Sequence, residues 1–157
     1  MNEPADSSLN RRLFLSRSAA ALAATSVAGF PMIGRAQAAP KPLKIALVGC
    51  GGRGSGAAGQ ALGADNYVQL AAMGDVFPDK LDTALKNLTA THGGKVDVPD
   101  AQKFIGFDAI DKICALKDID VVLLTTPPGF RPEHLQKCVD AGKHTLCEKP
   151  CATDAQA

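Results

Sequence analysis

The sequence has few aromatic residues and no excess of charge of either sign. Its 157 residues include no tryptophan, one tyrosine and six phenylalanines, which are too few for a platform on which nucleic-acid bases stack. Lysine and arginine number 17 against 16 aspartates and glutamates, so no basic field attracts a phosphate backbone. We therefore do not expect nucleic acid as a partner.

Cysteine pairs at metal-binding or redox spacing are also missing. The five cysteines are an odd number and contain no Cys-x-x-Cys pair, which argues against a disulfide framework. Cysteine and histidine are scattered rather than clustered, so we expect free thiols and no metal. Cys147 and Cys151 lie four residues apart around a proline, and we interpret them as packing residues.

No hydrophobic run predicts a stable membrane anchor, because Pro31 interrupts the Ala-rich segment. Residues 1–38 are instead typical of a twin-arginine signal peptide. They combine Arg11-Arg12 with a mild apolar run that contains Arg17, and they end in a small-x-small site. We expect cleavage after Ala38 and a periplasmic protein. A disordered basic tail and a membrane anchor are the alternatives.

Residues 39–157 are typical of a single α/β domain in which strands and helices alternate. Short apolar runs predict the strands, and periodic segments between them predict the helices. Asp108 is the expected N-cap of one helix and Gly142 the expected C-cap of another. The pattern predicts a doubly wound parallel sheet in the strand order 3-2-1-4-5. The expected strands are 43–48, 68–73, 104–106, 119–126 and 144–147, and the expected helices are 52–62, 78–91, 108–116 and 132–141.

A glycine-rich stretch lies between the first strand and the first helix, where it predicts a dinucleotide-binding turn. Gly49 permits the tight turn, Gly51 lets a pyrophosphate approach the backbone, and Gly54 lets the helix pack on the strand. Gly52 belongs to the same turn, and Arg53 adds a cation beside it. The helix N-terminus offers amide donors to the phosphates. A flexible glycine linker is the alternative.

Asp75 ends the second strand, 26 residues after Gly49. A carboxylate at this place can accept both hydroxyls of the adenosine ribose, and its charge repels a 2′-phosphate. We therefore predict NAD as the cofactor in preference to NADP. Asp79 and Asp82 are nearby alternatives, but they suit the N-terminus of the next helix.

Four segments closely resemble the Gfo/Idh/MocA oxidoreductases, and the resemblance extends over residues 43–157. That family includes inositol dehydrogenases and glucose–fructose oxidoreductase. The resemblance implies an NAD-binding Rossmann domain and hydride transfer involving a hydroxyl group of a sugar or polyol. The segments that carry it are "VGCGGRG", "MGDVFPDKL", "DIDVVLLTTPPGFRPEHLQKCVDAGKH" and "HTLCEKPCATD".

The same resemblance implies roles for residues near the nicotinamide end of the cofactor. Lys149 is the implied catalytic residue, which hydrogen-bonds the substrate hydroxyl. Glu148 is implied to orient Lys149, and these two residues are implied to contribute to cofactor binding. Pro150 is implied to fix the turn, through what resembles a cis peptide bond between Lys149 and Pro150. Thr126-Pro127 runs along the cofactor, and His134 lies near the nicotinamide ribose. An exposed helix position without a role is the alternative for His134.

The sequence departs from the family by ending at Ala157, whereas the family continues into a second, α+β substrate domain. We interpret residues 39–157 as an incomplete Rossmann domain that binds NAD weakly and does not turn over substrate alone. We expect the complete protein to be a homo-oligomer.

Two other functions remain open. An NAD-dependent glycosidase is disfavoured because the related glycosidases generally lack the intact Glu-Lys-Pro. A non-catalytic NAD-binding module is disfavoured because Lys149 and the glycines are present.

An exported NAD enzyme also has to carry its cofactor out in bound form. We therefore expect slow dissociation and regeneration of the cofactor in place.

Overall fold

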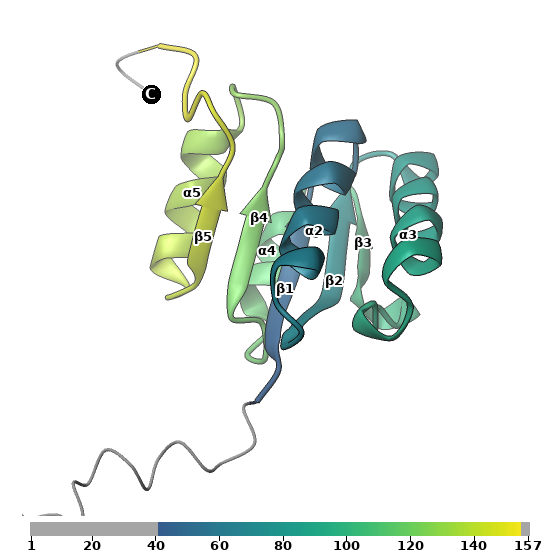
Figure 1. The fold of residues 1–157 in the computed structure, drawn as a ribbon. Coiled ribbons are helices and arrows are strands. Elements are labelled where there is room, and N and C mark those ends of the chain that lie inside the picture. Colours follow the sequence, from purple (N-terminus) through teal and green to yellow (C-terminus); the bar gives the residue numbers. More distant parts are fainter. Residues whose placement is uncertain (1–40, 155–157) are drawn as a thin grey trace, which may run out of the picture. The chain divides into compact units, whose positions relative to one another are not determined.

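A computed structural model describes residues 41–154 of the chain. The predicted signal peptide, residues 1–38, lies outside the described residues. Within the described part, five strands alternate with four α-helices along the chain (Figure 1).

The five strands form one parallel sheet in the order β3-β2-β1-β4-β5, which confirms the order predicted from the sequence. β1 lies between β2 and β4, with Val48 opposite Gly74 on one side and Leu124 on the other. Since every pairing is parallel, the carboxyl ends of all five strands meet at one edge of the sheet. The strands are β1 (Leu43–Val48), β2 (Val68–Asp75), β3 (Lys103–Ile105), β4 (Val121–Leu124) and β5 (His144–Cys147).

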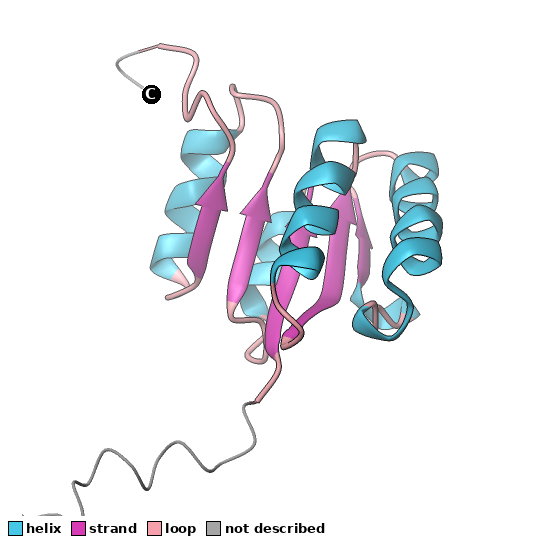
Figure 2. Ribbon diagram, viewed as in Figure 1, coloured by secondary structure: helices cyan, strands magenta, loops and turns pink. Residues whose placement is uncertain are grey.

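Two helices pack on each face of the sheet, as Figures 1 and 2 show. α2 (Gly52–Ala64) and α3 (Pro78–His92) cover one face, and α4 (Ala109–Ala115) and α5 (Arg131–Asp140) cover the other. Side chains of β1 alternate between the two layers. Ile45 and Leu47 belong to the core under α2 and α3, whereas Ala46 and Val48 belong to the core under α4 and α5. This double coverage explains why the central strands are near-continuous apolar runs.

One helix cap agrees with the sequence prediction in position, and one differs. Asp108 is the N-cap residue of α4, as predicted, but its carboxylate makes no capping hydrogen bond. It pairs instead with Lys112 at 2.7 Å, one turn along the helix, and this attraction draws the carboxylate away from the backbone amides. The C-cap of α5 is Ala141 rather than Gly142. Gly142 follows at a φ of +67°, the left-handed conformation that commonly closes a helix one residue later.

The segment 93–102 between α3 and β3 contains two short 3-10 helices, Gly93–Lys95 and Asp100–Gln102. The α-helices of the described part have 7 to 15 residues. Within residues 41–154, no helix has the length and apolar character needed to cross a membrane.

Candidate functional site

The turn after β1 requires glycine at two positions. Gly49 has a φ of +92°, and a Cβ there would lie 2.9 Å from the backbone nitrogen of Thr126. A Cβ on Gly54 would lie only 1.9 Å from the carbonyl oxygen of Gly49. The Thr125 hydroxyl donates to that same oxygen at 2.6 Å and ties the turn to the end of β4. The structure thus contains the tight turn and the close helix packing expected for Gly49 and Gly54.

The N-terminus of α2 is free of side chains that would compete with a bound anion. Gly51 is the N-cap and makes no side-chain capping bond, and the first turn contains no acidic residue. A Cβ at Gly51 or Gly52 would meet no atom within 4 Å. The first amides of a helix lack intrahelical acceptors and carry the positive end of its dipole. This end of α2 therefore suits a pyrophosphate that approaches the backbone closely.

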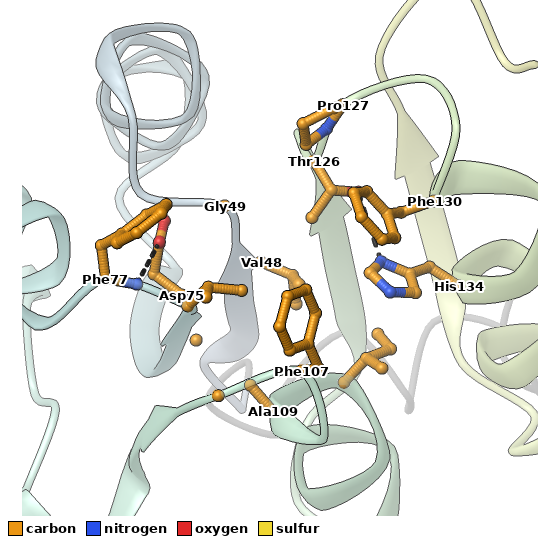
Figure 3. Close-up of a pocket in the computed structure, with 14 residues that line it drawn as sticks. Val48, Gly49, Asp75, Phe77, Phe107, Ala109, Thr126, Pro127, Phe130 and His134 are labelled. Atoms are coloured by element: carbon orange, nitrogen blue, oxygen red, sulfur yellow. Dashed lines mark hydrogen bonds between the residues drawn. The ribbon is translucent and has the colours of Figure 1, made fainter. Parts of the chain in front are cut away.

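Asp75 is held at the end of β2 by two backbone amides. Its Oδ2 accepts a hydrogen bond from the Cys50 nitrogen at 2.5 Å. Its Oδ1 accepts one from the Phe77 nitrogen at 2.9 Å (Figure 3). Burial, and then the charge of Asp75, raises the pKa of the Cys50 thiol to about 12. Cys50 therefore stays a neutral thiol beside the Asp75 carboxylate.

A pocket with a volume of about 290 Å³ opens beside Asp75 at the carboxyl edge of the sheet. Three exposed aromatic side chains line it, namely Phe77, Phe107 and Phe130 (Figure 3). Such an apolar pocket with one fixed carboxylate suits a flat, partly polar group such as adenosine. Its full lining is Val48, Gly49, Gly74, Asp75, Val76, Phe77, Gly106, Phe107, Ala109, Ile110, Thr126, Pro127, Phe130 and His134.

His134 lies at the wall of this pocket rather than on an exposed face of α5. Its Nδ1 is 3.3 Å from the Thr126 hydroxyl oxygen, and its ring stacks on Phe130 with 6.0 Å between centroids. Burial lowers the pKa of His134 below its ordinary value of 6.5, so the ring is neutral near pH 7. It can exchange a hydrogen bond with a ligand without adding a charge.

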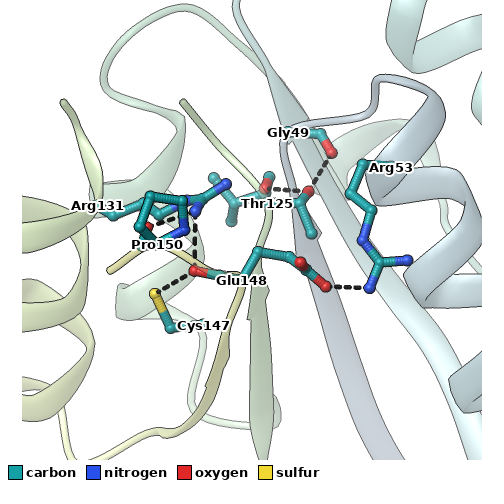
Figure 4. A network of polar contacts seen from close by, with 8 residues as sticks. Gly49, Arg53, Thr125, Arg131, Cys147, Glu148 and Pro150 are labelled. Atoms are coloured by element: carbon teal, nitrogen blue, oxygen red, sulfur yellow. Dashed lines mark hydrogen bonds and ion pairs between the residues drawn. The ribbon is translucent and has the colours of Figure 1, made fainter. Parts of the chain in front are cut away.

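The segment Glu148–Pro150 leaves the carboxyl end of β5. The Glu148 nitrogen donates to the Leu124 carbonyl at 2.9 Å, which continues the ladder between β4 and β5. The Glu148 carboxylate forms an ion pair with Arg53 from α2 (Figure 4). A hydrogen bond from Arg53 lowers the pKa of Glu148, and the same bond raises the pKa of Arg53. The two residues therefore remain charged, and they connect the glycine turn to this segment.

Lys149 is exposed and takes part in none of the ion pairs found among residues 41–154. The Lys149–Pro150 peptide bond is cis, as the resemblance implied. Glu148 was expected to orient Lys149, but the structure directs its carboxylate to Arg53 instead. The Lys149 ammonium is consequently available to a ligand at the carboxyl edge of the sheet, next to the end of β5.

Arg131 is a site residue that the sequence reasoning missed. It opens α5 and is only 6% exposed. Its guanidinium donates to the Thr126, Glu148 and Pro150 carbonyl oxygens (Figure 4). The sequence reasoning began this helix at Pro132 and gave Arg131 no role. An arginine before a helical proline carries no signal of burial, so only the fold reveals it.

The predicted residues thus gather at one edge in two groups. Gly49, Asp75, Thr126, Pro127 and His134 line the pocket. Arg53, Glu148 and Lys149 lie where α2 and the end of β5 meet, and Gly51, Gly52 and Gly54 belong to the turn that opens α2. All five cysteines are free thiols. The part of the chain that the structure describes contains no group of three or more His, Cys, Asp or Glu side chains arranged for a metal.

Comparison with known proteins gives the family of this fold. The family model GFO_IDH_MocA, described as "Oxidoreductase family, NAD-binding Rossmann fold", matches residues 43–157. The crystal structure of scyllo-inositol dehydrogenase from Lactobacillus casei with bound NAD(H) and scyllo-inositol superposes with a TM-score of 0.59. It is 30% identical and matches 74% of this chain and 30% of its own.

Two curated relatives show the range of named activities. Glycosyl hydrolase family 109 protein 1 of Bacteroides fragilis is 31% identical over 111 residues, 70% of this chain and 23% of the relative. The scyllo-inositol 2-dehydrogenase (NADP(+)) of Bacillus subtilis is 39% identical over 62 residues, 40% of this chain and 16% of the relative. The chain therefore spans 30% or less of the length of each of these proteins.

Proposed function

Because this chain belongs to the Gfo/Idh/MocA oxidoreductase family and has its NAD-binding Rossmann fold, we propose that its carboxyl edge binds NAD. We propose further that, in the complete protein, it serves hydride transfer from a hydroxyl-bearing carbon of a polyol or sugar. One observation carries this proposal. The glycine turn, Asp75 and Glu148–Pro150 lie at the same edge, on both sides of the point where strand order reverses between β1 and β4. Ligands of doubly wound sheets bind at that point.

The adenosine half of NAD fits the pocket beside Asp75. The remaining lone pairs of that carboxylate face ribose hydroxyls, while its charge opposes a 2′-phosphate. The named relatives include both an NAD(H)-bound and an NADP(+) enzyme. We propose NAD for this chain because two backbone amides fix the orientation of the Asp75 carboxylate beside the pocket.

The pyrophosphate fits the N-terminus of α2, where glycines leave the backbone open. Arg53 is within reach of the same place and is more than half exposed, so it can turn from Glu148 toward a phosphate. NAD bound here would supply the acceptor for the hydride. The glycine turn and Asp75 would bind and orient the cofactor, and Lys149 would contact the substrate hydroxyl.

Lys149 would donate a hydrogen bond to the substrate hydroxyl and favour loss of its proton. A positive charge at this place also opposes the cationic, oxidised nicotinamide ring and so favours hydride uptake. The substrate class follows from the relatives, two of which are named as scyllo-inositol dehydrogenases. We therefore propose a cyclic polyol or a related sugar.

The test uses the complete protein with NAD and a panel of inositols and monosaccharides. Formation of reduced nicotinamide, measured by absorbance, is the expected result with at least one member of the panel. A protein that binds NAD but reduces none of it with any polyol or sugar would contradict the hydride-transfer proposal.

A second candidate function is an NAD-dependent glycosidase, because a family 109 glycosyl hydrolase is 31% identical over 70% of this chain. In that reaction a hydride leaves the sugar and returns to it, so the cofactor shows no net change. Release of nitrophenol from an aryl glycoside without net NADH would favour this function over a dehydrogenase.

We also propose that residues 1–38 direct export through the twin-arginine route to the periplasm. A folded, exported protein would then carry NAD in bound form and regenerate it in place. The open space at Gly51 would let a pyrophosphate approach the backbone closely, which supports tight holding of the cofactor.

A further inference from the structure

Arg131 is a buried cation without an acidic partner. Its residue surface is 6% exposed, and it forms none of the ion pairs found among residues 41–154. Burying a charge is strongly unfavourable unless hydrogen bonds compensate for the lost hydration. The acceptors that compensate here are backbone carbonyl oxygens, so their positions and that of the guanidinium depend on one another.

These carbonyls come from the two turns at the carboxyl edge of β4 and β5. Nε donates to the Thr126 oxygen at 2.6 Å. Nη1 donates to the Glu148 oxygen at 2.8 Å and to the Pro150 oxygen at 2.6 Å. One planar group therefore joins a pocket-lining turn to the segment that follows β5.

The two carbonyls on Nη1 belong to the residues on either side of Lys149. Arg131 thus holds the carbonyls on both sides of Lys149 (Figure 4). The Lys149 residue itself is exposed. The bond to Thr126 sets this fixed segment at a defined distance from the turn that also contacts His134. No other side chain in the described part makes this set of three contacts.

We propose that Arg131 is a positioning residue that sets where Lys149 presents its ammonium relative to the cofactor-binding edge. This inference rests on the proposed role of Lys149 in hydride transfer. A planar guanidinium supplies several donors in fixed directions, whereas a lysine ammonium is a point charge on a flexible stem. The charge alone therefore does not replace the function of Arg131.

The chain offers a matched control for the loss of a cation that binds carbonyls. Lys143 donates from Nζ to the Leu116 oxygen at 2.5 Å and to the Ile119 oxygen at 2.8 Å. These atoms lie at the opposite edge of the sheet, before β4 and β5 begin. Lys143→Met removes a comparable clamp without touching the candidate site.

The experiment compares Arg131→Lys, Arg131→Met and Lys143→Met in the complete protein. Three quantities are measured below the unfolding temperature of each variant: amide hydrogen exchange of the segment 148–152, NAD affinity, and kcat with KM for substrate. For Arg131→Lys we expect exchange in this segment to rise about tenfold or more, since three carbonyls lose their fixed donors. We expect kcat to fall by about ten- to a hundredfold, as for a small misplacement of a reacting group.

In Arg131→Lys, NAD affinity should fall by a smaller factor than kcat, because Arg131 does not line the pocket beside Asp75 and reaches it only through the Thr126 carbonyl. Lys143→Met should lose stability yet keep both kcat and the exchange of residues 148–152. If Arg131→Met does not fold, Arg131→Lys decides alone, because it retains the buried charge.

Unchanged exchange at 148–152 in a folded Arg131→Lys protein would overturn the inference. The inference would also be overturned if kcat of Arg131→Lys fell only as much as its loss of stability explains, and by the same factor as kcat of Lys143→Met. If the wild-type protein turns over no polyol or sugar, the proposed function fails, and exchange still decides whether Arg131 positions the segment.

Discussion

In the proposed function, cofactor choice depends on Asp75, whose carboxylate is held beside the pocket by the amides of Cys50 and Phe77. Asp75→Ala should weaken NAD binding by about tenfold, the equivalent of 1.4 kcal/mol. It should also reduce the preference for NAD over NADP, because the charge that repels a 2′-phosphate is gone. Calorimetric titration of the complete protein with each cofactor measures both effects.

Asp79→Ala is the control for this change. Asp79 lies in the first turn of α3, and its ion-pair partner is the adjacent Lys80 at 3.9 Å. Unaltered affinities are expected for Asp79→Ala. Equal losses of NAD affinity in the two variants would remove the specific role of Asp75.

Lys149 carries the chemistry in the proposed function, and its exposed side chain contributes little to the fold. Lys149→Ala should lower kcat by at least about a hundredfold, the usual cost of removing a donor that stabilises negative charge developing on oxygen. NAD affinity should stay close to the wild-type value. Steady-state kinetics and a binding titration on the same preparation test this, with the exposed Lys86→Ala on α3 as control. Normal turnover by Lys149→Ala would show that another residue does this work.

His134 should make stability depend on pH. Burial lowers the pKa of His134 below 6.5 in the folded state. As pH falls through that value, the unfolded chain takes up a proton that the folded chain does not, so the free energy of unfolding decreases. The contribution is present above pH 6.5 and is lost on acidification until the folded-state pKa is passed.

Replacing His134 by glutamine should therefore flatten the stability profile between about pH 7 and pH 5. Urea unfolding at a series of pH values measures this slope. His144→Gln, at an exposed position, should retain the wild-type profile. If His134→Gln also retains the wild-type profile, the His134 imidazole does not contribute to the pH dependence of stability.

At the scale of elements, the packing of α2 against the turn after β1 depends on Gly54. A Cβ there would lie 1.9 Å from a backbone oxygen, so α2 would have to move as a unit. Gly54→Ala should destabilise the fold by about 2 kcal/mol or more and abolish NAD binding. Thermal unfolding and cofactor titration measure the two losses.

Gly56→Ala tests the same helix at an open position, where a Cβ would meet no atom within 4 Å. A gain of about 0.5–1 kcal/mol is expected there, since alanine favours the helix over glycine. A stable Gly54→Ala protein that still binds NAD would contradict the packing argument.

The elements themselves could be predicted because their rules are local. Strands covered on both faces become apolar runs, and a strand–glycine–helix pattern specifies the turn at Gly49. The predicted fourth strand, 119–126, was too long at both ends, because β4 spans only Val121–Leu124. The Thr125 side chain beyond it binds the glycine turn. Asp108 fits a local capping rule, but Lys112 competes for its carboxylate.

The contacts that complete the site could not be predicted, because they join distant positions. Arg53 and Glu148 are 95 residues apart in sequence, and Arg131 and Glu148 are 17 apart. Each pairing depends on how helices close over the sheet edge. Sequence reasoning found Arg53 and Glu148 as separate candidates and could not pair them, and it had no reason to expect a buried Arg131.

For the whole molecule, we predict that the complete protein purified from periplasm contains NAD. A twin-arginine signal implies export after folding, and the periplasm does not supply the nucleotide freely. Denaturing the protein and assaying the supernatant should release NAD in an amount approaching one equivalent. Protein that emerges without nucleotide, yet turns over once NAD is added, would show that the cofactor exchanges freely.

The central claim is that NAD binds along the carboxyl edge of this sheet, from the pocket at Asp75 to Glu148–Pro150. Hydrogen exchange of the complete protein with and without NAD tests it directly, because amides covered by the cofactor exchange more slowly. The account predicts protection at residues 49–54, 75–77, 126 and 148–149, with residues 116–120 and 141–143 at the opposite edge unchanged. Protection at the opposite edge, or none at the glycine turn when NAD is bound, would contradict it.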